Sequence, residues 1–157
     1  MADESIHSTL QPISFTVYGE PVAQGRPRMA VINGRAIAYD PKKSRDFKLN
    51  CKTIAQQHVP ERLLTGAVKL RITVYRQPPK SLSKTKLQKA LNGIIRPTTK
   101  PDLKNYIAGV EDAIEKVIYN NDSQVVELEC YKYYGDPPRI EVTVIPMEEV
   151  DDADKSE

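Results

Sequence analysis

The sequence predicts a single-domain α+β protein in which a mixed β-sheet is covered by two main helices. Segments with alternating apolar residues lie toward both ends of the chain, and two segments with apolar residues at helical spacing lie between them. The 157 residues are enough for one domain with a substantial core. We expect a flexible arm over 1–12, a folded domain over 13–147 and an acidic disordered tail over 148–157, which holds six acidic residues and one lysine.

The first elements are a strand and a hairpin. Residues 13–18 alternate apolar and polar side chains, which predicts a strand. Asn33 and Gly34 lie between two β-forming runs, the strongest short signal for a hairpin, and this hairpin carries Arg35. Asp40 before Pro41 predicts a helix N-cap, and the helix that follows ends before Pro60.

The middle of the chain alternates again and then becomes rich in lysine. Val68 to Tyr75 predicts a strand with one core face and one basic or aromatic face. Residues 81–92 predict a short helix closed by Gly93. It carries Lys84, Lys86 and Lys89, and both a DNA-contacting flap and a disordered surface loop fit this segment.

The segment 97–126 is the centre of the sequence. Asp102 predicts a helix N-cap whose side chain accepts backbone N–H groups, and apolar residues recur at helical spacing as far as Val117. A polar turn follows and ends at Asp122, and residues 124–134 predict a strand. We expect the last strand, which includes Ile140, Val142 and Val144, to pair with this preceding strand as a hairpin.

Several classes of protein are excluded or disfavoured. The chain has no apolar run long enough to cross a membrane and no signal-peptide pattern, which favours a cytoplasmic protein. Cys51 and Cys130 lack metal-ligand spacing and predict two buried thiols. His58 is expected at the negative end of its helix, and neither His7 nor His58 is expected to be catalytic.

The distribution of charge indicates a polyanionic partner. Residues 62–101 contain ten lysines or arginines and no acidic residue, and this basic run leads directly into Asp102. A solvated lysine-rich face is the alternative explanation. The residues we expect to contact DNA are Arg26, Arg28, Lys84, Lys86, Lys89, Arg96 and Lys100.

The string KPDLKNYIAGVEDAIEKVIYNNDSQVV, residues 100–126, resembles the signature of the RusA family of Holliday-junction resolvases. The register agrees without a gap at Asp102, Asn105, Asp112, Asp122, Ser123 and Gln124. The stretches GEPVAQGRPR and RIEVTVIP also resemble the first and last strands of the family, so the resemblance spans roughly residues 13–146. It implies a RusA-like nuclease domain, a homodimer, and cleavage of four-way junctions during DNA recombination and repair.

Three positions depart from the family pattern. The second aspartate of the first motif is Lys104 here, a lysine one helical turn later is Ala108, and the first of two paired turn aspartates is Asn121. These departures put cleavage in question but leave the fold assignment intact. A junction-binding protein without cleavage is therefore the alternative to an active Holliday-junction resolvase.

Phosphodiester hydrolysis requires an activated water and neutralisation of developing charge, and Mg²⁺ held by carboxylates supplies both. Asp102 and Asp122 are the expected catalytic and metal-binding pair, and we expect them to share one hydrated Mg²⁺ although a helix separates them in sequence. Asn105 and Asn121 are expected neighbours of the site, together with Lys104. Asp112 is expected to be structural because it lies about 15 Å further along the helix.

A third and weaker hypothesis is an RNA- or ribosome-associated basic protein, which does not explain the spacing of the aspartates.

Overall fold

The computed structural model describes residues 11–147. Before the first main helix lie β1 (Ile13–Tyr18), β2 (Arg28–Ile32) and β3 (Arg35–Tyr39). The helices are α2 (Lys42–Gln56), α3 (Lys84–Leu91) and α4 (Leu103–Ile114), and β4 (Val68–Arg76) lies between α2 and α3. A single 3₁₀ turn, Asp122–Gln124, precedes β5 (Val125–Tyr134), and β6 (Arg139–Pro146) follows. The predicted arm and acidic tail lie outside the described residues, apart from positions 11 and 12.

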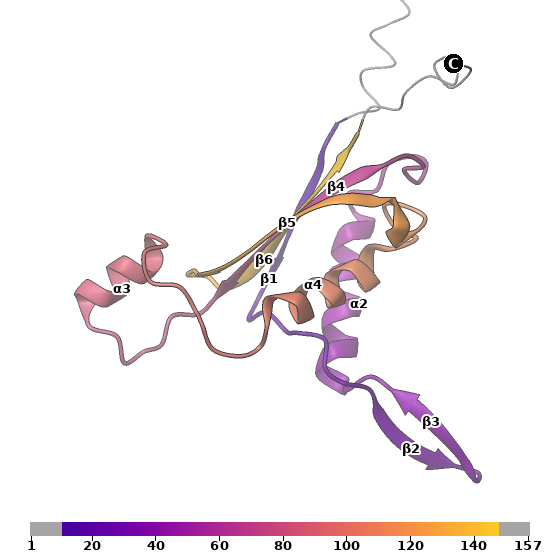
Figure 1. The fold of residues 1–157 in the computed structure, drawn as a ribbon, viewed down its shortest axis with the longest axis horizontal. Coiled ribbons are helices and arrows are strands. Elements are labelled where there is room, and N and C mark those ends of the chain that lie inside the picture. Colours follow the sequence, from indigo (N-terminus) through magenta and orange to yellow (C-terminus); the bar gives the residue numbers. More distant parts are fainter. Residues whose placement is uncertain (1–10, 148–157) are drawn as a thin grey trace, which may run out of the picture.

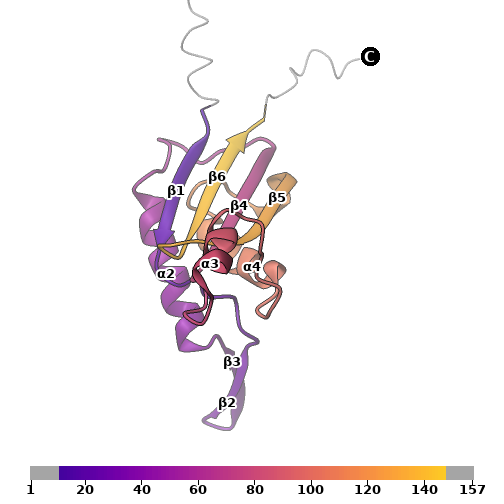
Figure 2. The same cartoon turned by 90° about the vertical axis from the view of Figure 1, so that its left-hand side faces the viewer.

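The main sheet is mixed, as predicted, and its strand order is β1-β6-β4-β5. Figure 2 shows the four strands in this order. β6 runs antiparallel to both β1 and β4, whereas β5 runs parallel to β4. The prediction that the last two strands pair as a hairpin is therefore wrong, because β4 lies between β5 and β6. β4 is buried on both edges, and β1 and β5 form the two edges of the sheet.

The connection from β5 to β6 crosses the end of β4 at Gly135. The Gly135 N–H donates to the carbonyl of Arg76 at 2.9 Å, which holds the crossing chain against the end of β4. A Cβ atom at Gly135 would lie 2.7 Å from the ring and 2.8 Å from the Cβ of Tyr75. The chain can therefore pass this close to Tyr75 only because residue 135 has no side chain.

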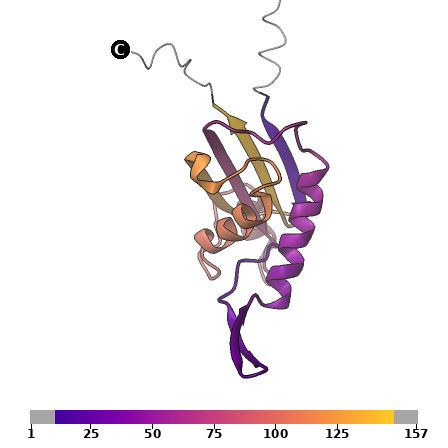
Figure 3. The ribbon, with the colours of Figure 1, turned by 90° about the vertical axis from the view of Figure 1, so that its right-hand side faces the viewer.

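α2 and α4 cover the same face of the sheet and pack against each other (Figure 3, α2 in purple and α4 in orange). The apolar positions of α2, such as Phe47 and Cys51, and those of α4, such as Tyr106 and Val110, face alternate residues of β4. Burial in this core raises the pKa of the Cys51 thiol to about 12, so the thiol stays protonated at neutral pH. The fold thus has two layers, and the second face of the sheet carries polar and aromatic side chains. Among the described residues no helix is long and apolar enough to cross a bilayer.

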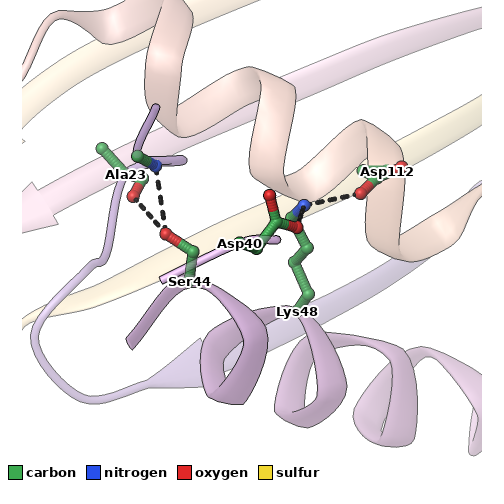
Figure 4. Close-up of polar contacts among 6 residues, drawn as sticks. Ala23, Asp40, Ser44, Lys48 and Asp112 are labelled. Atoms are coloured by element: carbon green, nitrogen blue, oxygen red, sulfur yellow. Dashed lines mark hydrogen bonds and ion pairs between the residues drawn. The ribbon is translucent and has the colours of Figure 1, made fainter. Parts of the chain in front are cut away.

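One lysine joins the two helices (Figure 4). Lys48 of α2 forms ion pairs with Asp112 of α4 and with Asp40, each with an N–O distance of 2.7 Å. Burial lowers the pKa of Lys48, but its hydrogen bonds to Asp112 and Asp40 outweigh that effect and raise it overall. Asp112 is thus structural, as predicted. Asp40 does not cap α2, whose N-cap is Pro41, because its carboxylate is engaged by Lys48.

Two segments project from this two-layer body in different directions (Figure 1). The first is the β2–β3 hairpin, which turns at Asn33 and Gly34 with φ angles of 53° and 77° as the Asn-Gly signal predicted. All of β3 and most of β2 are exposed. The second is α3, which begins where the Ser83 side chain accepts from the N–H of Lys86 and is followed by Gly93 at φ 77°. An ordered helix is therefore present where a disordered loop was the alternative.

Candidate functional site

Two cations hold the loop that leads into α4. Arg76, at the end of β4, donates from Nη1 to the carbonyl and hydroxyl of Thr99 at 3.4 and 3.1 Å and to the carbonyl of Lys100 at 3.2 Å. Lys132 of β5 donates from Nζ to the carbonyls of Thr99 and Pro101, both at 3.1 Å. The loop is thereby fixed to two neighbouring strands, and these bonds position the residue that follows it.

That residue is Asp102, the N-cap of α4. Its carbonyl accepts the first hydrogen bond of the helix, from the Asn105 N–H at 3.0 Å, but its side chain makes no capping bond. The prediction of a capping side chain is therefore wrong. Asp102 is exposed, and within the described part of the chain its carboxylate takes part in no ion pair. The carboxylate is free to bind a ligand at a helix end that carries positive partial charge.

The loop after β1 is held against the first turns of α4. The Gln24 N–H donates to the carbonyl of Asn105 at 2.9 Å. One residue later the Gly25 N–H donates to the hydroxyl of Ser44 at 3.0 Å, and this hydroxyl donates to the carbonyl of Ala23 at 3.4 Å (Figure 4). Apart from tyrosines, Ser44 is the one buried polar residue among residues 11–147. The backbone around residue 24 is thus anchored to both α2 and α4.

This anchoring places a basic loop beside the start of α4. Arg26 and Arg28 follow the anchored residues directly, are exposed, and form no ion pair among residues 11–147. Lys100 precedes Asp102 by two residues and is also exposed. Arg96 differs, since it donates from Nε to the carbonyl of Lys132 at 3.0 Å and stacks on a tyrosine ring. The exposed lysines of α3 extend the basic surface: Lys84, Lys86 and Lys89.

The tyrosines of the uncovered sheet face pack against one another and against arginines. The rings of Tyr75 and Tyr133 stack with their centroids 6.0 Å apart. Arg96 lies 3.8 Å above the Tyr133 ring, and Arg139 lies 3.9 Å above the Tyr75 ring. The outer faces of this stack are occupied by guanidinium groups, so these two tyrosines act as packing residues rather than as a platform for bases.

A second group of acids lies at the far end of α4. The helix ends at Ile114, earlier than its apolar periodicity predicted, and Lys116 turns the chain with φ 65°. The buried Tyr119 then donates from its hydroxyl to Oδ1 of Asp122 at 3.0 Å. Glu115, the C-cap of α4, lies close enough to Asp122 to raise the pKa of its carboxyl group. The turn therefore returns to the C-terminal end of the helix.

The electrostatics of Asp122 reflect these neighbours. Partial burial, the hydrogen bond with Glu115 and the charges of Glu115 and Glu111 raise its pKa to about 6, while the hydrogen bond from Tyr119 acts in the opposite direction. Burial also raises the pKa of Glu111. A negative charge at Asp122 is thus unfavourable in the isolated chain, and a nearby cation would relieve that repulsion.

Asp102 and Asp122 are consequently not neighbours. α4 contains 12 residues, a length of about 18 Å, with Asp102 at its start and Asp122 beside its end. The prediction that the two share one cation within a chain is wrong. The turn that contains Asp122 lies beside the C-terminal end of α4, and the chain does not return along the helix to Asp102. Among the described residues, no three His, Cys, Asp or Glu side chains come together to hold a metal ion.

Comparison with known proteins identifies the group to which these features belong. The family model described as Endodeoxyribonuclease RusA matches residues 18–145, which include both ends of α4 and both anchoring loops. The chain belongs to the RusA family. The protein YqaN of Bacillus subtilis (strain 168), described as uncharacterised, is 52% identical over 134 residues, which cover 84% of this chain and 94% of YqaN.

The second half of the RusA signature has a structural explanation in Gln124. Its Oε1 accepts from the N–H groups of Asn120 and Asn121 at 2.9 and 2.8 Å, and its Nε2 donates to the carbonyls of Leu64 and Gly66 at 2.8 and 3.0 Å. This side chain ties the turn before β5 to the segment before β4. The sequence identifies Gln124 as part of the motif, but it does not indicate that this side chain joins the two segments.

The positions that depart from the RusA pattern have clear surroundings. The Asn121 side chain accepts from the N–H of Ser123 at 2.9 Å and caps the 3₁₀ turn, so it has a backbone role. Lys104 and Ala108 are exposed on α4, and Lys104 forms no ion pair with Asp102 among the described residues. Lys104 therefore leaves the carboxylate of Asp102 unneutralised.

The raised pKa of Asp122 gives a test of this RusA-family turn. Between about pH 4 and pH 6 the folded chain holds a proton that the unfolded chain releases, so the free energy of unfolding falls as pH rises through this window. Asp122→Asn removes this decrease in the free energy of unfolding and retains an oxygen that can accept the hydrogen bond from Tyr119. The difference in Tm between Asp122→Asn and the wild type is therefore expected to increase by roughly 2–4 °C from pH 4 to pH 7.5. The effect is small because solvent screens the group.

Calorimetry with a chelator present measures this difference. Asp46→Asn, the same change at an exposed position of α2, is the matched control. A Tm difference between Asp122→Asn and the wild type that does not change with pH would contradict the assigned repulsion.

Proposed function

We propose that this RusA-family endodeoxyribonuclease is a divalent-metal-dependent homodimer that resolves four-way DNA junctions by paired phosphodiester hydrolysis. The observation that carries the proposal is the start of α4. There the exposed carboxylate of Asp102, which makes no capping bond, follows the exposed Lys100 by two residues, and the loop that leads to Arg26 and Arg28 is hydrogen-bonded to the first turn of α4. Carboxylates beside a phosphate-binding surface are the arrangement that metal-assisted hydrolysis of a nucleic acid requires.

The donor atoms suit a hard divalent cation. Mg²⁺ binds oxygen ligands and usually takes one or two carboxylates with several waters. Asp102 offers a free carboxylate, and Asp122 and Glu115 place two carboxylates in contact whose repulsion a cation would relieve. Asp102 at the start of α4 and Asp122 beside its end are each able to bind such an ion, which would supply a nucleophile at neutral pH and would stabilise developing charge on the phosphate.

The other residues of the site bind and position. Arg26, Arg28 and Lys100 are exposed and provide donors for phosphate oxygens. Arg76 and Lys132 hold the loop before Asp102 through its carbonyls, and they fix the carboxylate relative to those donors. A homodimer suits the substrate, since two symmetric cuts require two sites related by a twofold axis.

The deciding experiment is a nicking assay on a synthetic four-way junction, with linear duplex of the same sequences as the control substrate. We expect paired, symmetric nicks in the junction with Mg²⁺, no nicks with a chelator, and no nicks in the duplex. Nicks in both substrates at equal rates would contradict junction resolution and leave a non-selective nuclease.

A junction-binding protein without cleavage is the second candidate, and Lys104 favours it. This lysine places a cation two residues after Asp102, where the family pattern has a carboxylate. In the same assay, retained binding of the junction without nicks under any divalent cation would establish this second function.

A further inference from the structure

The β2–β3 hairpin exposes apolar side chains on both of its strands. Val31 is 76% exposed, the highest value among the large apolar residues that the structure describes, and Met29 and Ile32 are 66% and 54% exposed. No residue of either strand belongs to the buried core of residues 11–147. Exposed apolar patches of this kind mark sites of interaction.

The register gives the hairpin two different faces, because residues paired across two antiparallel strands lie on the same face. One face is entirely apolar and consists of two cross-strand pairs, Met29 with Ala38 and Val31 with Ala36. The other face carries Arg28 at the base of the hairpin and Arg35 beside the turn. Since Arg35 pairs with Ile32, the two arginines lie about 13 Å apart along the hairpin.

The charge of this segment favours a nucleic acid as its partner. Residues 21–39 contain Arg26, Arg28 and Arg35 and no aspartate or glutamate. All three arginines are exposed and form no ion pair among the described residues. A second copy of the hairpin would bring like charges together, whereas phosphate groups would neutralise them.

Both ends of the hairpin are fastened to α4. Before β2, the Gln24 N–H donates to the carbonyl of Asn105 in the first turn of α4 at 2.9 Å. After β3, Asp40 pairs with Lys48, which also pairs with Asp112 of α4 (Figure 4). The hairpin extends beyond the start of α2, away from the sheet (Figure 3). Its base is therefore fixed relative to the helix that begins at the candidate carboxylate.

The side chains of the hairpin suit the faces of bases better than their edges. Base edges in a groove are recognised largely through hydrogen bonds, and between positions 29 and 39 only Asn33, Arg35 and Tyr39 have polar side chains. Apolar side chains contact base faces instead, when they insert between neighbouring base pairs.

Base faces are most accessible where the stack of base pairs is interrupted. In a continuous duplex each pair covers its neighbours, so insertion requires the stack to be opened first. At the branch point of a four-way junction the stack is already broken, and the free-energy cost of insertion is lower there. An apolar hairpin of this kind therefore distinguishes a junction from a duplex.

We propose that the β2–β3 hairpin is a wedge that inserts Val31 and Ile32 between the base pairs at the branch point of a four-way junction. Arg28 and Arg35 bind the phosphates that flank the insertion. Because its base is fixed to α4, the wedge also sets the distance from the branch point to the phosphate at the start of that helix. The proposal rests on the proposed function for its substrate, but insertion does not depend on cleavage.

The base analogue 2-aminopurine measures insertion directly, since its fluorescence increases when it is unstacked. Wild-type protein, bound in Ca²⁺ to a synthetic four-way junction, is expected to raise the emission of 2-aminopurine at the branch point several-fold. The emission of 2-aminopurine about one helical turn away within an arm is expected to stay unchanged. Equal increases at both positions, or no increase at the branch point of a saturated junction, would overturn the wedge.

A pair of substitutions removes the apolar contact and keeps the strand. Val31→Thr with Ile32→Thr retains β-branched side chains, which favour strands. This variant is expected to lose most of the emission increase and to bind the junction roughly tenfold more weakly, with duplex affinity within about twofold of the wild type. Val59→Thr with Leu63→Thr, at exposed apolar positions beyond the other end of α2, is the matched control and is expected to behave as the wild type.

A conservative variant separates insertion from the folding of the hairpin. Val31→Leu with Ile32→Leu keeps apolar side chains, although leucine is less favoured in strands than threonine, and it is expected to retain the emission increase. Equal losses in the leucine and threonine variants would overturn the wedge, since the loss would then follow strand formation. Arg28→Gln with Arg35→Gln is expected to weaken binding to junction and duplex alike and to keep the emission increase at saturation.

The outcomes distinguish this proposal from the proposed function. An emission increase at the branch point without nicks in Mg²⁺ would overturn cleavage and support the wedge in a junction-binding protein. Nicks without an emission increase would overturn the wedge and leave the proposed function standing. Equal losses of junction and duplex affinity in the threonine variant would make the hairpin a groove contact, and a changed oligomeric state in light scattering would make it a subunit interface. Either result would overturn the wedge.

Discussion

Replacement of Asp102 by asparagine is expected to reduce junction cleavage by roughly a thousandfold, because the loss of a metal-binding carboxylate removes several kcal/mol of transition-state stabilisation. Binding of the junction in Ca²⁺ or chelator is expected to stay equal or to tighten, since the substitution removes a negative charge from a phosphate-binding surface. The fold is not expected to change, because the Asp102 side chain makes no capping bond.

Single-turnover cleavage and a binding titration, each on the same junction, measure the two effects separately. Asp46→Asn removes the same charge from α2, where the Asp46 carboxylate forms no ion pair among the described residues, and this variant is expected to cleave at nearly the wild-type rate. Cleavage by Asp102→Asn within tenfold of the wild type would remove Asp102 from the catalytic site.

Reversal of Lys84, Lys86 and Lys89 to glutamate is expected to weaken DNA binding by about a hundredfold, for junctions and duplexes alike. These exposed lysines lie on α3, which projects from the body and has no acidic residue in it. Contacts between lysines and phosphates release counterions. The negative slope of log K against log salt is therefore expected to become shallower by up to about three in this variant.

Titrations at several salt concentrations measure this slope. The matched variant reverses Lys42, Lys43 and Lys52 on α2, which makes the same change in net charge. An equal loss of affinity in both triple variants would show that overall charge, and not α3, determines binding. Unchanged affinity in the α3 variant would make α3 a solvated face.

Local patterns in the sequence predicted the elements well. The alternation in β4, the Asn-Gly turn of the hairpin and the helical spacing in α4 each depend on neighbours within a few residues, and each was confirmed. The strand order was not predictable in this way. β6 alternates with the same period whether it lies beside β5 or between β1 and β4, and the insertion depends on the glycine crossing at Gly135.

The candidate site was predicted only in part for a similar reason. The family motif identifies Asp102 and Asp122 as chemically important, but it contains no information on the direction in which the chain leaves α4. The early end at Ile114 and the turn at Lys116 place Asp122 beside Glu115, and the hold of Lys132 on the loop before Asp102 is a contact across more than thirty residues. Interactions of this kind have no local sequence period.

The β2–β3 hairpin is tied to the body only at its base and contributes no side chain to the core. Substitutions in it are therefore expected to have little effect on the stability of the core. Because it starts at Arg28, beside the anchored loop that faces α4, each such change alters the surface next to Asp102. A change in the hairpin would therefore alter the surface beside the proposed site and leave the core of the fold unchanged.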